Sequence, residues 1–162
     1  MNIILVGFMA SGKSTVGKIL SKKHNLKFVD TDSLIERKFN KRIKDIFKEN
    51  GENFFRCAEH NIISSDLKYC TDCIISTGGG MPCFYNNMDC LKNIGWVVYL
   101  KCDFETIKQR VKRGTRPLFE NEGAAYNLFV QRLKCYEKSH FEIDASKDLS
   151  KVVLEIERIM KS

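Results

Sequence analysis

Short runs of apolar residues alternate along the chain with longer segments in which apolar residues recur at helical spacing. The runs are continuously apolar, which is typical of strands in a parallel sheet covered on both faces. In the last segment Val152, Val153, Ile156 and Ile159 form one amphipathic face. This pattern predicts strands at 2–6, 27–29, 73–76, 97–100 and 141–143, and helices at 13–24, 32–39, 43–50, 54–68, 88–93, 104–111, 126–138 and 149–161.

The first predicted strand leads into Gly7–Thr15, a complete G-x-x-x-x-G-K-S/T phosphate-binding loop, and a predicted helix follows it. The motif requires this strand–loop–helix context, which makes a chance match a weak alternative. Its glycines allow a tight turn whose backbone N–H groups point at a phosphate. We expect a nucleoside triphosphate to bind here, with Lys13 at the β- and γ-phosphates and Mg²⁺ on the Ser14 hydroxyl. The nucleotide contacts expected in the loop are Gly7, Ala10, Ser11, Gly12, Lys13, Ser14 and Thr15.

Together, the loop and the strand–helix alternation predict an α/β fold, a three-layer P-loop NTPase sheet of five parallel strands. The 162 residues fit one domain. The least regular stretch is 113–125, where Gly114, Pro117 and Gly123 lie close together. Such an insertion between two helices of a nucleotide-binding enzyme predicts a mobile lid, with a plain surface loop as the alternative.

The composition is that of an ordinary globular protein, with 43% hydrophobic and 29% charged residues. No run approaches the ~18 apolar residues of a membrane span, and Met1 leads directly into the first strand, where no signal peptide fits. The net charge of +7 lies largely in helical pairs such as Lys22-Lys23, which we interpret as solubilising faces. We therefore expect a cytoplasmic protein without a nucleic-acid or membrane partner, whose positive charge suits anionic ligands.

Seven cysteines are present, and their odd number in a chain of this size favours reduced thiols. The C-x-x-C spacing of Cys70 and Cys73 could mark a redox pair or half a zinc site. The sequence has no second such pair, and its three histidines are scattered. We interpret Cys70–Cys73 as a helix end that enters a strand.

Two further patterns narrow the class of P-loop protein. The sequence lacks the Asn-Lys-x-Asp motif that reads guanine, and the strand at 73–76 ends in Gly78-Gly79-Gly80 instead of an acidic residue. Three glycines at the carboxyl end of a strand allow close backbone approach to a ligand. Asp30 and Asp32 follow the second strand at the same edge of the sheet, so one could hold Mg²⁺ through water while the other orients an acceptor hydroxyl. The alternative for Asp32 is a helix N-cap.

In this order and spacing, the motifs resemble those of shikimate kinases over about residues 4–146. The resemblance implies a P-loop kinase of the nucleoside-monophosphate-kinase type, which uses ATP and Mg²⁺ to phosphorylate shikimate on the pathway to aromatic amino acids and works as a cytoplasmic monomer. The matching segments are Gly7–Thr15, Asp30-Thr31-Asp32, Ile46-Phe47, Gly51-Glu52, Phe55-Arg56, Glu59, Thr77–Gly80 and Arg116-Pro117-Leu118.

The same resemblance implies roles for individual residues. Asp32 is expected to act as general base, and Lys13 and Arg116 to stabilise the transferred phosphoryl group. The acceptor carboxylate calls for arginine, because a guanidinium matches a carboxylate with two parallel hydrogen bonds. The acceptor contacts, carried in part by helices within about 32–62, are Asp32, Arg56, Gly78, Gly79, Gly80 and Arg132; the metal contacts are Ser14 and Asp30; the adenine-side contacts are Arg110 and Lys147.

Some departures and alternatives stay open. Lys134 stands where the family usually has proline, and Arg132 could instead be an exposed helix arginine. Two other functions are a gluconate-type or nucleotide-type P-loop kinase and a catalytically silent module that binds nucleotide or nucleic acid.

Overall fold

A five-stranded parallel sheet organises the chain, and the computed structural model describes residues 1–113 and 121–162 of it. The strand order is β2-β3-β1-β4-β5, so β1 is central and pairs with β3 and β4. All strands expected from the apolar runs are present, and the α/β class is confirmed. Their bounds are β1 Ile3–Val6, β2 Lys27–Asp30, β3 Cys73–Ser76, β4 Trp96–Lys101 and β5 Phe141–Asp144.

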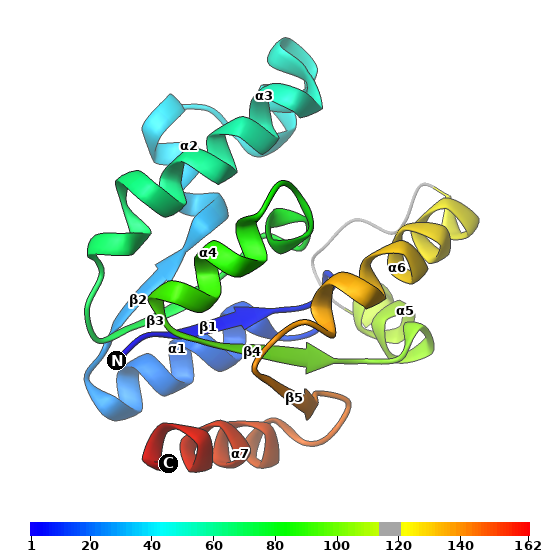
Figure 1. Ribbon diagram of the computed structural model, residues 1–162. Coiled ribbons are helices and arrows are strands. Elements are labelled where there is room, and N and C mark those ends of the chain that lie inside the picture. The colour runs from blue at the N-terminus through cyan, green and yellow to red at the C-terminus, as the bar shows by residue number, and fades with distance from the viewer. Residues whose placement is uncertain (114–120) are drawn as a thin grey trace.

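Helices cover both faces of this sheet (Figure 1). Helices α1 and α7 pack against each other on one side, and α3 and α4 lie on the other. Two short 3-10 turns, η1 and η2, flank β3. The bounds are α1 Lys13–His24, α2 Thr31–Phe39, α3 Ile43–Ser65, η1 Leu67–Tyr69, η2 Met81–Cys83, α4 Asn87–Ile94, α5 Phe104–Arg113, α6 Glu122–Tyr136 and α7 Leu149–Lys161.

Burial explains why the apolar runs are continuous. Every residue of β1 and β3 is buried, because both strands lie between two layers of helices. The spaced apolar residues of α7, such as Val152 and Ile156, complete the core from one side. Because all strands run parallel, their carboxyl ends lie at one edge of the sheet, and the candidate site residues lie at this edge.

Two helices differ from their expected bounds by more than two residues at one end, and one of them merges two expected helices. The expected break between 43–50 and 54–68 is a kink at Gly51, whose φ of 84° is not helical, and α3 continues through it to Ser65. Helix α6 begins at Glu122, earlier than expected, because the Asn121 side chain accepts a hydrogen bond from Ala124 N at 3.0 Å and caps it. The proposed lid covers 113–125. Its last residues, 122–125, are therefore helical, and 114–120 lie outside the described residues.

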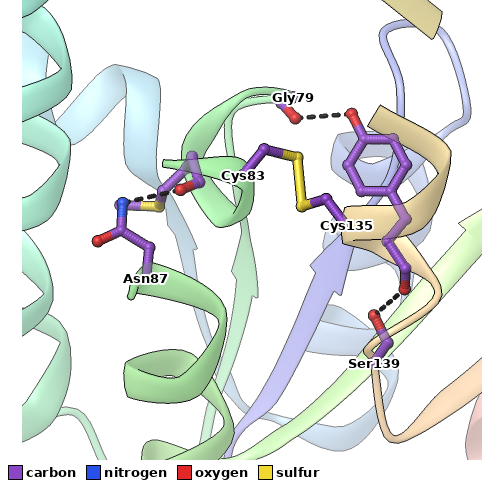
Figure 2. The surroundings of a disulfide bond; sticks show 7 residues. Gly79, Cys83, Asn87, Cys135 and Ser139 are labelled. Atoms are coloured by element: carbon purple, nitrogen blue, oxygen red, sulfur yellow. Dashed lines mark hydrogen bonds between the residues drawn. A yellow bond between two sulfur atoms is a disulfide. The ribbon is translucent and has the colours of Figure 1, made fainter. Parts of the chain in front are cut away.

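The cysteines also differ from expectation. Cys83 of η2 and Cys135 of α6 form a disulfide with their Cα atoms 5.4 Å apart, so the expectation of reduced thiols throughout is wrong at this pair (Figure 2). The two are separated by 52 positions, and only the packing of α6 against η2 brings them together. Cys70 follows η1 and Cys73 begins β3, in line with a helix end that enters a strand. The free thiols are Cys57, Cys70, Cys73, Cys90 and Cys102.

In the ranges 1–113 and 121–162, no helix has the length and apolar character that crossing a membrane would require.

Candidate active site

The phosphate-binding loop joins β1 to α1, and its backbone explains its glycines. Gly7 has a φ of 151°, and a β-carbon there would lie 2.8 Å from both Leu100 O and Ser11 Oγ. Gly12 has a φ of 99° and caps α1. The Lys13 ammonium folds back over the loop and donates to Gly7 O at 2.8 Å and Phe8 O at 2.9 Å. The loop therefore holds its cation close to the helix N-terminus, as phosphate binding requires.

Beside the loop lies a cavity of about 350 Å³. Arg110 of α5 forms part of its wall and donates to Ala10 O at 3.2 Å and Ala145 O at 2.6 Å. Lys147 reaches the same cavity and pairs with Glu155 at 2.8 Å. Both residues expected on the adenine side thus lie next to the loop. The full lining is Ala10, Ser11, Gly12, Lys13, Ser14, Thr15, Val16, Arg110, Ala145, Lys147, Leu149 and Val152.

The two residues expected to hold Mg²⁺ contact each other. Ser14 Oγ donates to Asp30 Oδ2 at 3.0 Å and lies 3.3 Å from Ser76 Oγ. The other Asp30 oxygen accepts from Ser33 N at 3.1 Å and caps α2. The N-cap is therefore Asp30, so the cap alternative for Asp32 is wrong. A hydroxyl beside a carboxylate is a set of hard oxygen ligands that suits Mg²⁺.

Asp32, in the first turn of α2, lies against the glycine loop that follows β3. A β-carbon at Gly78 would lie 2.7 Å from Asp32 Oδ1, and Gly78 N donates to Thr31 Oγ1 at 2.9 Å. Burial raises the pKa of Asp32, the Asp30 charge raises it further, and the Lys13 ammonium partly offsets both. Asp32 is thus a partly desolvated carboxylate placed between the phosphate-binding loop and the glycine loop.

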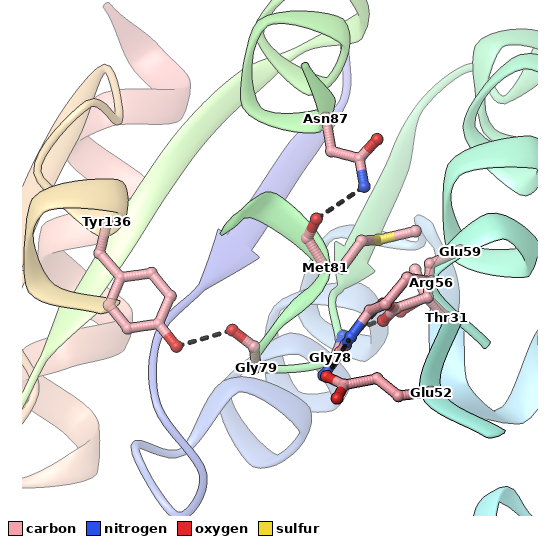
Figure 3. A network of polar contacts seen from close by, with 9 residues as sticks. All are labelled: Thr31, Glu52, Arg56, Glu59, Gly78, Gly79, Met81, Asn87 and Tyr136. Atoms are coloured by element: carbon pink, nitrogen blue, oxygen red, sulfur yellow. Dashed lines mark hydrogen bonds and ion pairs between the residues drawn. The ribbon is translucent and has the colours of Figure 1, made fainter. Parts of the chain in front are cut away.

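Arg56 of α3 lies in a buried network on the other side of the glycines (Figure 3). Its Nη1 donates to Glu59 Oε1 at 2.7 Å, and its Nε donates to Glu52 Oε1 at 3.3 Å. Its guanidinium lies 4.2 Å from the Phe84 ring centroid. A β-carbon at Gly80 would lie 2.5 Å from Arg56 Nη1, so glycine is needed for this close approach. Arg56 is therefore held in one orientation at the glycine loop.

Glu59 is the counter-ion of this arginine and is completely buried. Burial raises the pKa of Glu59 to about 7, although the hydrogen bond and charge of Arg56 act in the opposite direction. Its Oε2 faces Gly78, where a β-carbon would lie 3.1 Å away. The sequence shows Glu59 three positions after Arg56 on a helix, which is the spacing of a side-chain pair. This spacing indicates the pair but not what Glu59 does at the glycine loop.

Arg132 and Tyr136 approach the glycine loop from α6. A β-carbon at Gly79 would lie 3.2 Å from Arg132 Nη1, and Tyr136 Oη donates to Gly79 O at 2.6 Å. Arg132 is half-buried, so it is not the exposed helix arginine that its sequence context left open. No sequence signal pointed to Tyr136, because its role depends on a contact with a distant loop.

The predicted acceptor residues therefore converge on one loop, beside the phosphate-binding loop. Asp32, Arg56 and Arg132 come from three different helices and surround Gly78–Gly80. Two guanidinium groups can bind a carboxylate, and a nearby carboxylate can accept a hydroxyl proton. Arg116, expected in the lid, lies outside the described residues.

Comparison with known proteins identifies the family. The family model described as shikimate kinase matches residues 9–161. The chain belongs to the shikimate kinase family. A shikimate kinase from Sulfurihydrogenibium sp. (strain YO3AOP1) is 42% identical over 156 residues, which are 95% of this chain and 93% of that protein. The family predicted from the motifs is thereby confirmed.

Solved structures agree with this assignment. The shikimate kinase from Acinetobacter baumannii, solved in complex with shikimate, superposes with a TM-score of 0.89 at 33% identity, covering 98% of this chain and 92% of that one. A deoxyadenosine kinase from M. mycoides with bound dATP has a TM-score of 0.67 at 20% identity, with full coverage of both chains, and shares the fold alone. The expected resemblance to nucleotide kinases in fold is therefore confirmed.

Proposed function

We propose that this shikimate kinase transfers the γ-phosphoryl group of ATP to the 3-hydroxyl of shikimate, with the nucleotide in the P-loop cavity and the acceptor at Gly78–Gly80. The observation that carries the proposal is the convergence of Arg56, Arg132 and Asp32 on that glycine loop. An acceptor with one carboxylate and several hydroxyls matches this set of two cations and one carboxylate. A phosphate or adenine acceptor gives no comparable reason for a carboxylate at Asp32.

Arg56 and Arg132 bind the acceptor carboxylate from opposite sides of the loop, and backbone N–H groups of Gly79 and Gly80 contact the acceptor. Asp32 accepts the proton of the reacting hydroxyl, whose oxygen then bonds to the γ-phosphorus as the bond to the β-phosphate oxygen breaks. The raised pKa of Asp32 favours this role, because a more basic carboxylate takes a proton more readily.

Lys13 stabilises the charge that develops on the transferred group, and Arg116 of the proposed lid is expected to add a second cation. Ser14 and Asp30 would hold Mg²⁺, which neutralises charge on the β- and γ-phosphates when it is bound. Arg110 and Lys147 contribute to the adenine side of the cavity. We expect a cytoplasmic monomer without nucleic-acid or membrane partners.

The first experiment measures ADP production by the purified protein with Mg²⁺-ATP and shikimate, gluconate, AMP or no acceptor. Turnover with shikimate alone supports the proposal, and turnover with gluconate or AMP points to the corresponding kinase. ATP binding without turnover on any acceptor would favour a silent module.

Two variants then test the roles. Asp32→Asn is expected to lower turnover at least about a hundredfold while ATP binding stays nearly unchanged. Arg56→Ala is expected to raise the KM for shikimate and leave the KM for ATP alone, because it removes a contact to the acceptor only. Arg37→Ala, at an exposed arginine of α2, is the matched control for lost charge. An Asp32→Asn enzyme with most of its turnover would rule out the general base.

A further inference from the structure

The glycine loop continues into η2, and residues 78–83 together form what we call the acceptor loop. One side of this loop is fixed by α4 and α3. Asn87 Nδ2 donates to Met81 O at 2.8 Å, and the other amide atom of Asn87 lies 2.7 Å from His60 Nδ1. These contacts hold the middle of the loop. They are made with Met81 and not with Gly79, which lies against Arg132.

Gly79 is held from the opposite side by α6. Tyr136 Oη donates to the Gly79 carbonyl at 2.6 Å, and the Tyr136 ring is buried against Tyr99 with centroids 5.1 Å apart. Burial raises the pKa of Tyr136 to about 12, so the hydroxyl remains a donor at neutral pH. A rigid donor on the Gly79 carbonyl fixes the orientation of the peptide that joins Gly79 to Gly80.

The neighbouring residue of α6 makes a second attachment. Cys135 is bonded to Cys83 at the far end of the acceptor loop, and Figure 2 shows this disulfide between the loop and the helix. The last turn of α6 is therefore attached to the acceptor loop at two points, Gly79 and Cys83. Arg132 lies one turn earlier on the same helix, so these attachments also set its position relative to Gly79.

We propose that Tyr136 and the Cys83–Cys135 disulfide are positioning residues for the acceptor, and that reducing the disulfide weakens shikimate binding without weakening ATP binding. This inference rests on the proposed acceptor site. A dithiol supplies two electrons and two protons, the S–S bond breaks to two thiols, and the dithiol becomes a disulfide. Among residues 1–113 and 121–162, none of those that line the nucleotide cavity belongs to the acceptor loop or to α6, so we expect the effect to be specific for the acceptor.

The test compares steady-state kinetics of the oxidised protein and the protein reduced with dithiothreitol. Thiol titration of the denatured protein identifies the two states. The oxidised protein should have five titratable thiols and the reduced protein seven. Reduction is expected to raise the KM for shikimate about fivefold, a factor similar to that of one hydrogen bond, with the KM for ATP within about twofold. An unchanged KM for shikimate in protein with seven titratable thiols would overturn the proposal.

Variants separate the two attachments. Cys135→Ser should show the higher KM for shikimate without reductant and no further response to it, and Cys83→Ser should behave in the same way. Cys90→Ser, at a free cysteine of α4, should keep the response of the unmodified protein. Tyr136→Phe keeps the buried ring, loses the hydrogen bond to Gly79, and should raise the KM for shikimate in both redox states. If Tyr136→Phe leaves that KM unchanged, the tyrosine is not a positioning residue.

Failure of this inference can be told apart from failure of the proposed site. Arg56→Ala is assayed in parallel with shikimate and ATP. If Arg56→Ala does not affect the KM for shikimate, the acceptor site itself is misplaced. If Arg56→Ala raises that KM and reduction does not, only the positioning role is wrong. Loss of fold alone would raise both KM values or lower the active fraction, and the ATP measurement detects it.

Discussion

Glu59 is the residue whose replacement gives the sharpest test of the buried network. Its side chain is inaccessible to solvent and accepts from Arg56 Nη1 at 2.7 Å. Its second oxygen has no hydrogen-bond partner among the described residues. The structure therefore places a carboxylate where the charged form is poorly solvated and is hydrogen-bonded to one cation, Arg56. Glu59→Gln keeps the shape and an acceptor oxygen for Arg56 but cannot titrate.

The sign and size of the effect follow from proton linkage. Burial raises the pKa of Glu59 from its ordinary 4.5 to about 7 in the folded protein. Between these values the folded protein holds a proton that the unfolded chain releases, so stability falls as pH rises. The contribution of Glu59 is complete below pH 4.5 and is lost as pH rises through 7. From pH 5 to pH 8 the loss is on the order of 2 kcal/mol.

The assay is urea unfolding of the unmodified protein and of Glu59→Gln at pH 5, 6, 7 and 8, followed by circular dichroism. The difference between their free energies of unfolding cancels the other titrating groups. We expect that difference to change by about 2 kcal/mol from pH 5 to pH 8, because the unmodified protein loses this stability as pH rises and Glu59→Gln does not. Glu52→Gln, which removes the more exposed carboxylate on Arg56, is the control for lost charge. Parallel stability curves for the unmodified protein and Glu59→Gln would refute the reasoning.

Three further predictions concern the two halves of the site. Gly80→Ala places a methyl group 2.5 Å from Arg56 Nη1, so we expect the KM for shikimate to rise about tenfold with the KM for ATP unchanged; steady-state kinetics with equal values for both proteins would contradict this. Lys13→Ala should lower kcat at least about a hundredfold in the ADP assay, because a cation at the transferred group is lost, and a smaller drop would remove Lys13 from that role. Removing divalent metal with EDTA should abolish turnover and Mg²⁺ should restore it, whereas Ser14→Ala should need more Mg²⁺ for half-maximal rate; turnover in EDTA would exclude the metal.

The sequence predicted those parts of the fold that depend on local signals. The apolar runs identified every strand of the sheet, because burial on both faces leaves continuous hydrophobic stretches. The motif at Gly7–Thr15 located the nucleotide loop, since two positive-φ glycines and a lysine are needed within one short segment. The edge of the sheet that carries Asp30 and Asp32 followed from the shared direction of parallel strands. The roles assigned to the site residues remain predictions.

The remaining features depend on contacts between distant segments. Cys83 and Cys135 pair because α6 packs on η2, and counting cysteines could not reveal this. Tyr136 and Glu59 act through a carbonyl and a guanidinium that only the folded chain brings near them. The start of α6 was misplaced because Gly123 indicated a loop, whereas the Asn121 cap is strong enough to begin the helix before it.

The disulfide described at the acceptor loop also acts on the unfolded chain. It closes a covalent loop between positions 52 apart, and this loop contains β4, whose partner β1 lies outside it. Such a closure removes conformational freedom worth about 4 kcal/mol from the unfolded state in the chain-entropy model. One bond therefore links two quantities that are usually independent, the precision of a binding site and the entropy of the disordered chain. A cell compartment that keeps thiols reduced would loosen the binding site and raise the entropy of the unfolded chain, so both acceptor binding and stability would fall.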